Sequence, residues 1–189
     1  MNKSRTIVRD IVARIMPFDQ QEAAHRDDVL AWIDGGGELF RRRKPDVPAK
    51  HLVSYVVIVD GARRSVLLMH HRKAGLWLPT GGHVEADEDP YKTAVRELGE
   101  ELGPRAVQVA SVADLPLFVT VTQTVGAGTH TDVSLWYVVA GDEHMWLDPD
   151  PREFLGHRWQ SLEDILGTDP RELDPHMHRF VAKLQASQI

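Results

Sequence analysis

Cysteine is absent from this 189-residue chain. Without cysteine the protein can form neither disulfide bonds nor thiolate metal sites, and it has no thiol nucleophile for catalysis. A chain without disulfide chemistry is compatible with a reducing compartment, and we expect a cytoplasmic protein.

Long apolar runs are also missing, because no stretch approaches the roughly 18 apolar residues that a membrane-spanning helix needs. The formal net charge of −6 disfavours binding to nucleic acid and to anionic membrane surfaces. The expected partner is therefore a small molecule. Any phosphate groups on that molecule must be met by local positive charge or by a metal ion.

Several common catalytic signatures are missing as well. The sequence contains no G-x4-G-K-S/T phosphate loop, no G-x-S-x-G nucleophile elbow and no H-E-x-x-H helix. The ten histidines are scattered, and their spacing predicts no transition-metal site. With 42% hydrophobic and 26% charged residues, the composition is that of an ordinary globular protein.

The segment from residue 81 to residue 103 is rich in acidic side chains. Three of them, Glu97, Glu100 and Glu101, are spaced so that a helix would carry their carboxylates on one face. Like charges at these spacings destabilise a helix by roughly 0.2–0.5 kcal/mol per pair. A divalent cation between the carboxylates would remove this repulsion, and oxygen ligands of this kind indicate Mg²⁺ or Mn²⁺.

The spacing in this segment resembles the Nudix box, G-x5-E-x7-R-E-U-x-E-E-x-G-U, in which U is a bulky aliphatic residue. Only the last position differs, since Pro104 stands where the aliphatic residue is expected. The resemblance extends over about residues 50 to 165, although only the box is specific. A solvated acidic face on a surface helix is the alternative. It does not explain the glycine pair before the helix. The matching positions are Gly82, Glu88, Arg96, Glu97, Leu98, Glu100, Glu101 and Gly103.

The resemblance implies roles for individual residues. Glu97, Glu100 and Glu101, together with the carbonyl of Gly81, are expected to bind Mg²⁺ or Mn²⁺. Structural roles are expected for Gly82, Glu88, Arg96 and Gly103, with Glu88 paired to Arg96.

Members of this family often carry a further metal-binding or base-forming acid on the loop before the last strand. Glu153 is the best match here, with Asp148 and Asp150 as competitors. Glu97 and Glu153 are both candidates for the general base that activates water. The predicted catalytic residues are therefore Glu97, Glu100, Glu101 and Glu153.

The resemblance also implies an α+β fold, an αβα sandwich around a mixed β-sheet. We expect a Nudix domain over residues 48–189, preceded by a helical extension over residues 1–47. Apolar spacing predicts helices over residues 4–16 and 19–34, which would dock on the domain or form a homodimer contact. A cap that sets substrate specificity is the less favoured role.

Local patterns predict the remaining elements. Gly99 inside a helix costs roughly 1 kcal/mol relative to alanine, which suggests close packing at that position. Asp89 and Pro90 are expected to begin the box helix, and Ser161 and Asp174 to begin two later helices. Strands are expected over residues 52–59, 65–70, 107–112, 117–125 and 132–139, with a turn at residues 126–128.

Five further residues are candidates for substrate binding. Arg72 and Lys73 could meet a substrate phosphate, since both side chains are cationic. His130 and Asp132 could hydrogen-bond a base or sugar, and Trp136 could stack on a nucleobase. For each of these residues a purely structural role is the alternative.

These features together predict a metal-dependent, MutT-like hydrolase. It would cleave a phosphoanhydride bond in a nucleoside diphosphate linked to another group, most simply a nucleoside triphosphate or a modified form. A nucleotide-sugar or ADP-ribose type diphosphatase is the alternative, although the proline typical of ADP-ribose hydrolases is replaced by Thr120. A nucleotide-sensing regulator without hydrolytic activity is a second alternative. The absence of cysteine counts against isopentenyl diphosphate isomerase chemistry.

Overall fold

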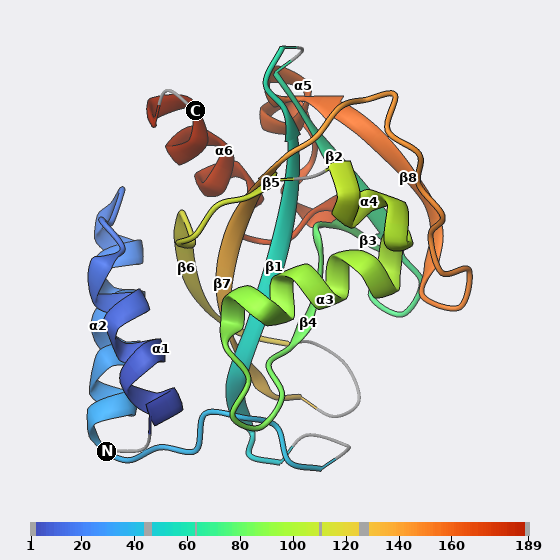
Figure 1. Ribbon diagram of the computed structural model, residues 1–189. Helices are drawn as coiled ribbons and strands as arrows, with labels where there is room; N and C mark the ends of the chain where they lie inside the picture. The colour runs from blue at the N-terminus through green and yellow to red at the C-terminus, as the bar shows by residue number, and fades with distance from the viewer. Residues whose placement is uncertain (1–2, 44–46, 63, 110, 125–128, 188–189) are drawn as a thin grey trace. The chain divides into compact units, whose positions relative to one another are not determined.

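The helices and strands come from a computed structural model that describes residues 3–43, 47–62, 64–109, 111–124 and 129–187. Figure 1 labels the elements along the chain. In order, they are α1 (Lys3–Arg14), α2 (Gln20–Asp34), β1 (Lys50–Asp60), β2 (Ser65–His71), β3 (Leu76–Leu78), β4 (Thr80–His83), α3 (Pro90–Leu102), α4 (Pro104–Val109), β5 (Ser111–Val112), β6 (Phe118–Gln123), β7 (Thr131–Ala140), β8 (Phe154–Ser161), α5 (Leu162–Gly167), the 3-10 helix η1 (Pro170–Glu172) and α6 (Met177–Ala186).

The strands are hydrogen-bonded in the order β3-β2-β1-β7-β5, while β4 pairs with β1, β6 with β7 and β8 with β2. The pairs β1–β2, β2–β3, β2–β8, β5–β7 and β6–β7 are antiparallel. The expected combination of helices with one large β-sheet is therefore present.

The contacts within the chain divide it into two compact units, and each unit is described by itself. Unit 1 contains Met1–Tyr55, Gly82–Ala94 and Asp114–Tyr137. Unit 2 contains Val56–Gly81, Val95–Ala113 and Val138–Ile189. The strands β1, β4 and β7 and the helix α3 each contribute residues to both units.

Unit 1 contains the N-terminal helical pair. Figure 1 shows α1 and α2 side by side, and α2 also packs on β6. Asp19 accepts a hydrogen bond from the Glu22 N–H, which confirms the predicted start of the second helix. The Glu22 side chain is fully buried and accepts from the N–H groups of Phe18 and Val119, so a carboxylate joins α2 to β6.

Unit 2 contains the strand β2, which pairs with β8 from Ser65 opposite Ser161 to His71 opposite Phe154. The expected strand over residues 65–70 and the Ser161 cap of α5 are both confirmed. The last helix, α6, packs against α5. Its apolar residues Met177, Phe180, Val181 and Leu184 are buried.

The predicted strand over residues 107–112 is wrong, because residues 104–109 form the helix α4 and only Ser111–Val112 pair as a strand. Gly103, at φ 88°, ends α3, and Pro104 suits the first position of a new helix. The close packing expected at Gly99 is confirmed, since a Cβ atom there would lie 3.1 Å from Cγ2 of Val107. The predicted turn at residues 126–128 lies outside the described residues.

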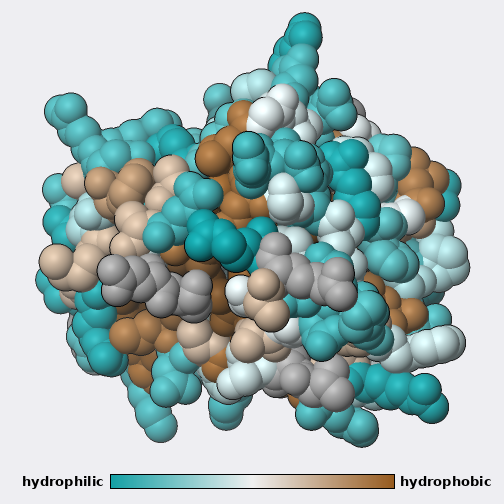
Figure 2. All heavy atoms as spheres, turned by 90° about the horizontal axis from the view of Figure 1, so that it is seen from above, coloured by the Kyte–Doolittle hydropathy of each residue, from teal (hydrophilic) through white to brown (hydrophobic). Residues whose placement is uncertain are grey.

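The visible face in Figure 2 is mostly hydrophilic, with hydrophobic side chains gathered in smaller patches. None of the helices in the described part of the chain has the length and apolar character that crossing a membrane requires. The large hydrophobic residues with exposed side chains are Met16, Phe18, Val47, Trp146, Leu155 and Leu166.

Candidate active site

The C-terminal part of α3 lies in unit 2 and carries three of the predicted ligands. The Glu97 side chain is 13% exposed and that of Glu100 is 61% exposed, while Glu101 is only 6% exposed. On the same helix, Leu98 and Leu102 are fully buried. The helix therefore holds two carboxyl groups away from water and a third at the surface.

Glu101 is held by the backbone of β4, because the Gly81 N–H donates a 2.8 Å hydrogen bond to its Oε2. Gly81 has a φ of 144°, which residues with a side chain rarely adopt. Burial raises the pKa of Glu101 to about 9, and the charges of Glu97 and Glu153 add to this effect, whereas the Gly81 hydrogen bond opposes it. This carboxyl group is therefore protonated at neutral pH unless a cation offsets its desolvation.

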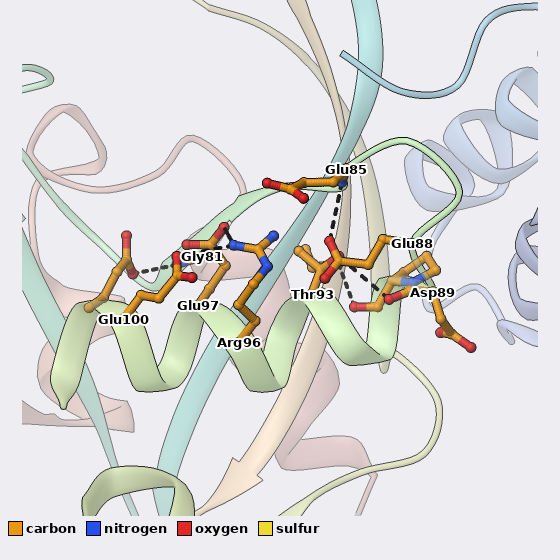
Figure 3. Close-up of polar contacts among 11 residues, drawn as sticks. Gly81, Glu85, Glu88, Asp89, Thr93, Arg96, Glu97 and Glu100 are labelled. Atoms are coloured by element: carbon orange, nitrogen blue, oxygen red, sulfur yellow. Dashed lines mark hydrogen bonds and ion pairs between the residues drawn. The ribbon is translucent and has the colours of Figure 1, made fainter. Parts of the chain in front are cut away.

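Burial also raises the pKa of Glu97, while its hydrogen bond with Arg96 acts in the opposite direction. The Arg96 Nη1 atom lies 2.7 Å from Oε1 of Glu97 and 3.1 Å from Oε2 of Glu100 (Figure 3). One guanidinium group therefore neutralises part of the like charge that the sequence concentrates on this helix.

The loop before β8 is attached to the end of α3 by main-chain hydrogen bonds. The Asp148 N–H donates to the Leu102 carbonyl at 3.0 Å, and the Asp150 N–H donates to the Glu101 carbonyl at 3.1 Å. These bonds occupy carbonyls that a helix leaves without partners at its C-terminus. The loop therefore continues from a fixed position beside the acidic residues of α3.

Glu153 lies at the end of this loop, where its carbonyl accepts a 2.8 Å hydrogen bond from the Arg72 N–H. Its exposed side chain lies close enough to Glu101 to contribute to the raised pKa of that carboxyl group. The structure thus brings Glu97, Glu101 and Glu153 together.

The two competing acids are engaged elsewhere. Asp150 binds Arg152 through both carboxylate oxygens, and this interaction lowers the pKa of Asp150 to about 2. Asp148 lines a small surface pocket with Gly103, Pro104 and Trp146. Of the three loop acids considered from the sequence, Glu153 is the one that contacts a box carboxyl group.

The model of the NUDIX domain matches residues 49–184 of the chain. The chain belongs to the Nudix family. The predicted Nudix resemblance, the Nudix-type fold and the prediction of a Nudix hydrolase are confirmed at the level of the family.

Relatives of this Nudix protein differ in what they are named for. Over 63 residues it is 36% identical to the m7GpppN-mRNA hydrolase NUDT17 of Xenopus laevis, a match that covers 31% of this chain and 21% of that protein. The E. coli dihydroneopterin triphosphate pyrophosphohydrolase has a similar structure, with a TM-score of 0.57 and 18% identity over 77% of this chain and 99% of that chain. A C. elegans Ap4A hydrolase has a TM-score of 0.57 and 19% identity, over 72% and 96% of the two chains. Both structures share the fold.

The first part of the Nudix box lies in unit 1. Glu88 accepts hydrogen bonds from the Thr93 hydroxyl at 2.7 Å and from the Glu85 N–H at 3.2 Å (Figure 3). Asp89 accepts a 2.9 Å hydrogen bond from the Tyr91 N–H, in agreement with its expected role at the start of α3. The pairing of Glu88 with Arg96 stays a prediction, as do the roles of Gly82 and the Gly81 carbonyl.

The predicted phosphate-binding residues follow β2 in unit 2. Arg72 donates a 2.8 Å hydrogen bond from its Nη2 to the Pro151 carbonyl, and Lys73 is exposed. Their binding to substrate phosphates stays a prediction.

The three other substrate-binding candidates lie in unit 1. Trp136 is fully buried, donates from its Nε1 to the Thr120 hydroxyl at 3.0 Å and packs edge-on against Phe118. Trp136 is therefore placed as a core residue. Its stacking on a nucleobase stays a prediction, which the burial of the side chain does not support. The other two candidates, His130 and Asp132, contact each other, with 3.1 Å between Nε2 and Oδ1.

Sequence reasoning missed the group to which His130 and Asp132 belong. The side chains of His51 and His83 join them, and one potential ligand atom from each of the four lies within 4.8 Å of the others. The only signal in the sequence is the spacing of His130 and Asp132, which places both side chains on one face of a strand. The prediction of no transition-metal site used spacing within helices and could not detect residues that come from separate strands.

Proposed function

We propose that this Nudix protein hydrolyses a phosphoanhydride bond in a nucleoside diphosphate linked to another group, with Mg²⁺ or Mn²⁺ as the cofactor. The observation that supports this most directly is the convergence of Glu97, Glu101 and Glu153 within unit 2. Two of these carboxyl groups are buried enough for their pKa values to rise. A bound cation would favour the charged form of these carboxylates, which burial disfavours.

The donor atoms fit a hard dication. All of the candidate ligands offer oxygen, which Mg²⁺ and Mn²⁺ prefer. Because several of these ligands are carboxylates, a divalent cation offsets more of their negative charge than a monovalent one would. Glu97, Glu100 and Glu101 would hold the ion, together with the carbonyl of Gly81. When bound, the ion supplies Lewis-acid activation of the phosphate oxygens and neutralises the charge that develops on them.

The protein's own part in the reaction is to position and deprotonate water. Glu153 is exposed and reaches Glu101, so we assign it as the general base. Glu97, which Arg96 holds at 2.7 Å, is the second candidate. The water oxygen forms a bond to phosphorus, the bond from phosphorus to the leaving-group oxygen breaks, and the water proton passes to the carboxylate.

The proposed substrate is a nucleoside triphosphate or a modified form of it, which would give a monophosphate and pyrophosphate. A triphosphate also stands in the name of the E. coli protein that shares this fold. A nucleotide-sugar or ADP-ribose type diphosphatase is the second candidate function. It is retained because the carboxylates act on the phosphoanhydride, which these substrates share.

A product screen tests the proposal. The full chain is incubated with Mg²⁺ and nucleoside triphosphates, ADP-ribose, nucleotide sugars, Ap4A or an m7GpppG cap analogue, and the phosphorus products are identified by ³¹P NMR. Monophosphate and pyrophosphate from a triphosphate support the proposal. Turnover of nucleotide sugars or ADP-ribose alone would favour the second candidate. Nucleotide binding without turnover of any compound would contradict hydrolysis and indicate a sensor.

A further inference from the structure

Four metal-ligating side chains converge in unit 1, and none of them belongs to the proposed active site of acidic residues. His51 is on β1, His83 ends β4, and His130 and Asp132 lie at the start of β7. His51 is fully buried, and the side chains of His130 and Asp132 are 15% and 16% exposed. These side chains are therefore largely removed from water. Their polar atoms need a hydrogen-bond partner within the protein or a bound ion instead.

The hydrogen bonding of His51 fixes its proton. Its Nδ1 lies 2.8 Å from the Pro48 carbonyl, and because a carbonyl oxygen only accepts, Nδ1 carries the hydrogen. In the neutral ring, Nε2 then presents a lone pair, and the Oδ1 of Asp132 lies 3.4 Å from it. A proton or a cation must separate these two electron-rich atoms. A backbone carbonyl that accepts from the second ring nitrogen is also the common arrangement at a metal-bound histidine.

Asp132 provides the second observation. Its Oδ1 is buried and makes no hydrogen bond within the described ranges of the chain, although Nε2 atoms of His130 and His51 lie 3.1 and 3.4 Å away. Both distances are close to the spacing of two ligand atoms around a shared ion. Around a tetrahedral Zn²⁺ with bonds of about 2.0–2.1 Å, two donor atoms are separated by about 3.3–3.4 Å.

The orientation of the rings also favours a neutral, metal-binding form. The His51 and His130 rings are stacked with their centroids 5.0 Å apart, so that protonating both would place two positive charges face to face. The Nδ1 of His130 lies 3.2 Å from the Thr124 hydroxyl, which fixes the ring from its other side. The His83 ring also lies close to that of His51, with 4.8 Å between the two ring centroids.

We propose that His51, His83, His130 and Asp132 form a binding site for a divalent transition-metal ion, with Zn²⁺ preferred. Three imidazole nitrogens and one carboxylate oxygen are a ligand set typical of Zn²⁺, whereas Mg²⁺ and Ca²⁺ favour oxygen ligands alone. With four protein ligands the site would be closed, as structural zinc sites are. The ion would join three segments of unit 1 that lie far apart in the sequence.

Arg41 provides a test that a purely structural network would not pass. Its Nη1 lies 3.3 Å from Nε2 of His83, and because a guanidinium group only donates, this nitrogen accepts from Arg41. An ion would therefore compete with Arg41 for Nε2 or bind the ring through Nδ1. Because a cation repels a second cation, the ion also binds against the charge of Arg41. Arg41→Gln should therefore tighten Zn²⁺ binding, whereas the loss of a ligand should weaken it.

The experiment uses the full chain without a histidine tag, stripped of metal with EDTA and titrated with Zn²⁺ by calorimetry. We expect one equivalent to bind. Asp132→Asn and His51→Ala should each weaken the affinity at least about tenfold. The control His157→Ala changes an exposed histidine of unit 2 and should leave the affinity unchanged. Binding that is equal in the wild type and both ligand variants, or no binding at all, would overturn the proposal.

A measurement on the wild type guards against variants that fail to fold. Co²⁺ in place of Zn²⁺ should give the intense visible absorption of a tetrahedral site, and one equivalent should saturate it. The weak spectrum of hydrated, six-coordinate Co²⁺ would contradict the site. Glu101→Gln should retain the Co²⁺ spectrum while losing Mg²⁺-dependent hydrolysis, so failure of the proposed function and failure of this site give different results.

Discussion

The cluster of glutamates in unit 2 and the cluster of histidines with Asp132 in unit 1 are assembled in opposite ways. The first draws Glu97 and Glu101 from one helix and adds Glu153 from a loop tied to the end of that helix. The second takes His51 from β1, His83 from β4, and both His130 and Asp132 from the start of β7. The first offers oxygen and the second mainly nitrogen, so that each suits a different class of metal ion. Ligands spaced along one helix can be found by reading a sequence, whereas ligands that meet only through strand pairing cannot.

The largest expected effect is that of removing the buried box carboxylate. Glu101→Gln should reduce kcat with Mg²⁺ about a thousandfold, because the stabilisation that a metal ion supplies amounts to several kcal/mol. Steady-state rates across Mg²⁺ concentrations measure the change. Glu163→Gln, which alters an exposed acid of α5, is the matched control. Comparable activity in the Glu101 variant and the control would exclude this group from the chemistry.

A somewhat smaller effect is expected for the general base. Glu153→Gln should lower kcat about a hundredfold with little change in KM, since positioned acid–base catalysis contributes about 10²–10⁴ in rate. Asp150→Asn, which breaks only the contact with Arg152, is the control on the same loop. Full activity in the Glu153 variant together with loss in Glu97→Gln would move the base to Glu97.

Metal-dependent stability separates the two groups. Zn²⁺ at about 100 times its Kd should stabilise the wild type by about 2.7 kcal/mol. In a chain of this size that corresponds to an increase in Tm of about 5–10 °C. Calorimetry should show the increase in Glu101→Gln but not in Asp132→Asn. An increase that persists in the Asp132 variant would place the Zn²⁺ elsewhere.

The smallest expected effect concerns the backbone at the proposed active site. Gly81→Ala forces a side chain into a φ of 144° and should cost about 1–3 kcal/mol of folding stability. It should also lower the activity, because the Gly81 N–H orients Glu101. At Gly61 an added Cβ meets nothing within 4 Å and φ is ordinary, so Gly61→Ala should leave both quantities nearly unchanged. Equal stabilities of the two variants would show that the backbone at Gly81 relaxes.

The parts of the fold that the sequence predicts depend on neighbouring residues. Asp19, Asp89 and Ser161 sit at the starts of helices as expected, because a cap is a contact across two or three positions. The strand predicted over residues 107–112 was wrong because that prediction also used only neighbouring residues. A short run of small and β-branched residues does not by itself distinguish a helix from a strand. Here Gly103 and Pro104 decided for the helix.

The proposed active site was only partly accessible from the sequence. The box spacing pointed to the acidic face of α3, and the family resemblance pointed to Glu153, but neither indicated that Glu100 stays exposed or that Arg96 contacts two of the carboxylates. The histidine group depends on how strands separated by some thirty to fifty residues are aligned, which no local pattern encodes. The hydrogen bond from His51 to the Pro48 carbonyl likewise involves a backbone atom, whose position no local sequence pattern predicts.

The main-chain attachment of the loop before β8 has a consequence for how this enzyme can diversify. The hydrogen bonds from Asp148 to Leu102 and from Asp150 to Glu101 use no side-chain atoms. The side chains of this loop can therefore vary while the backbone that carries Glu153 stays in place.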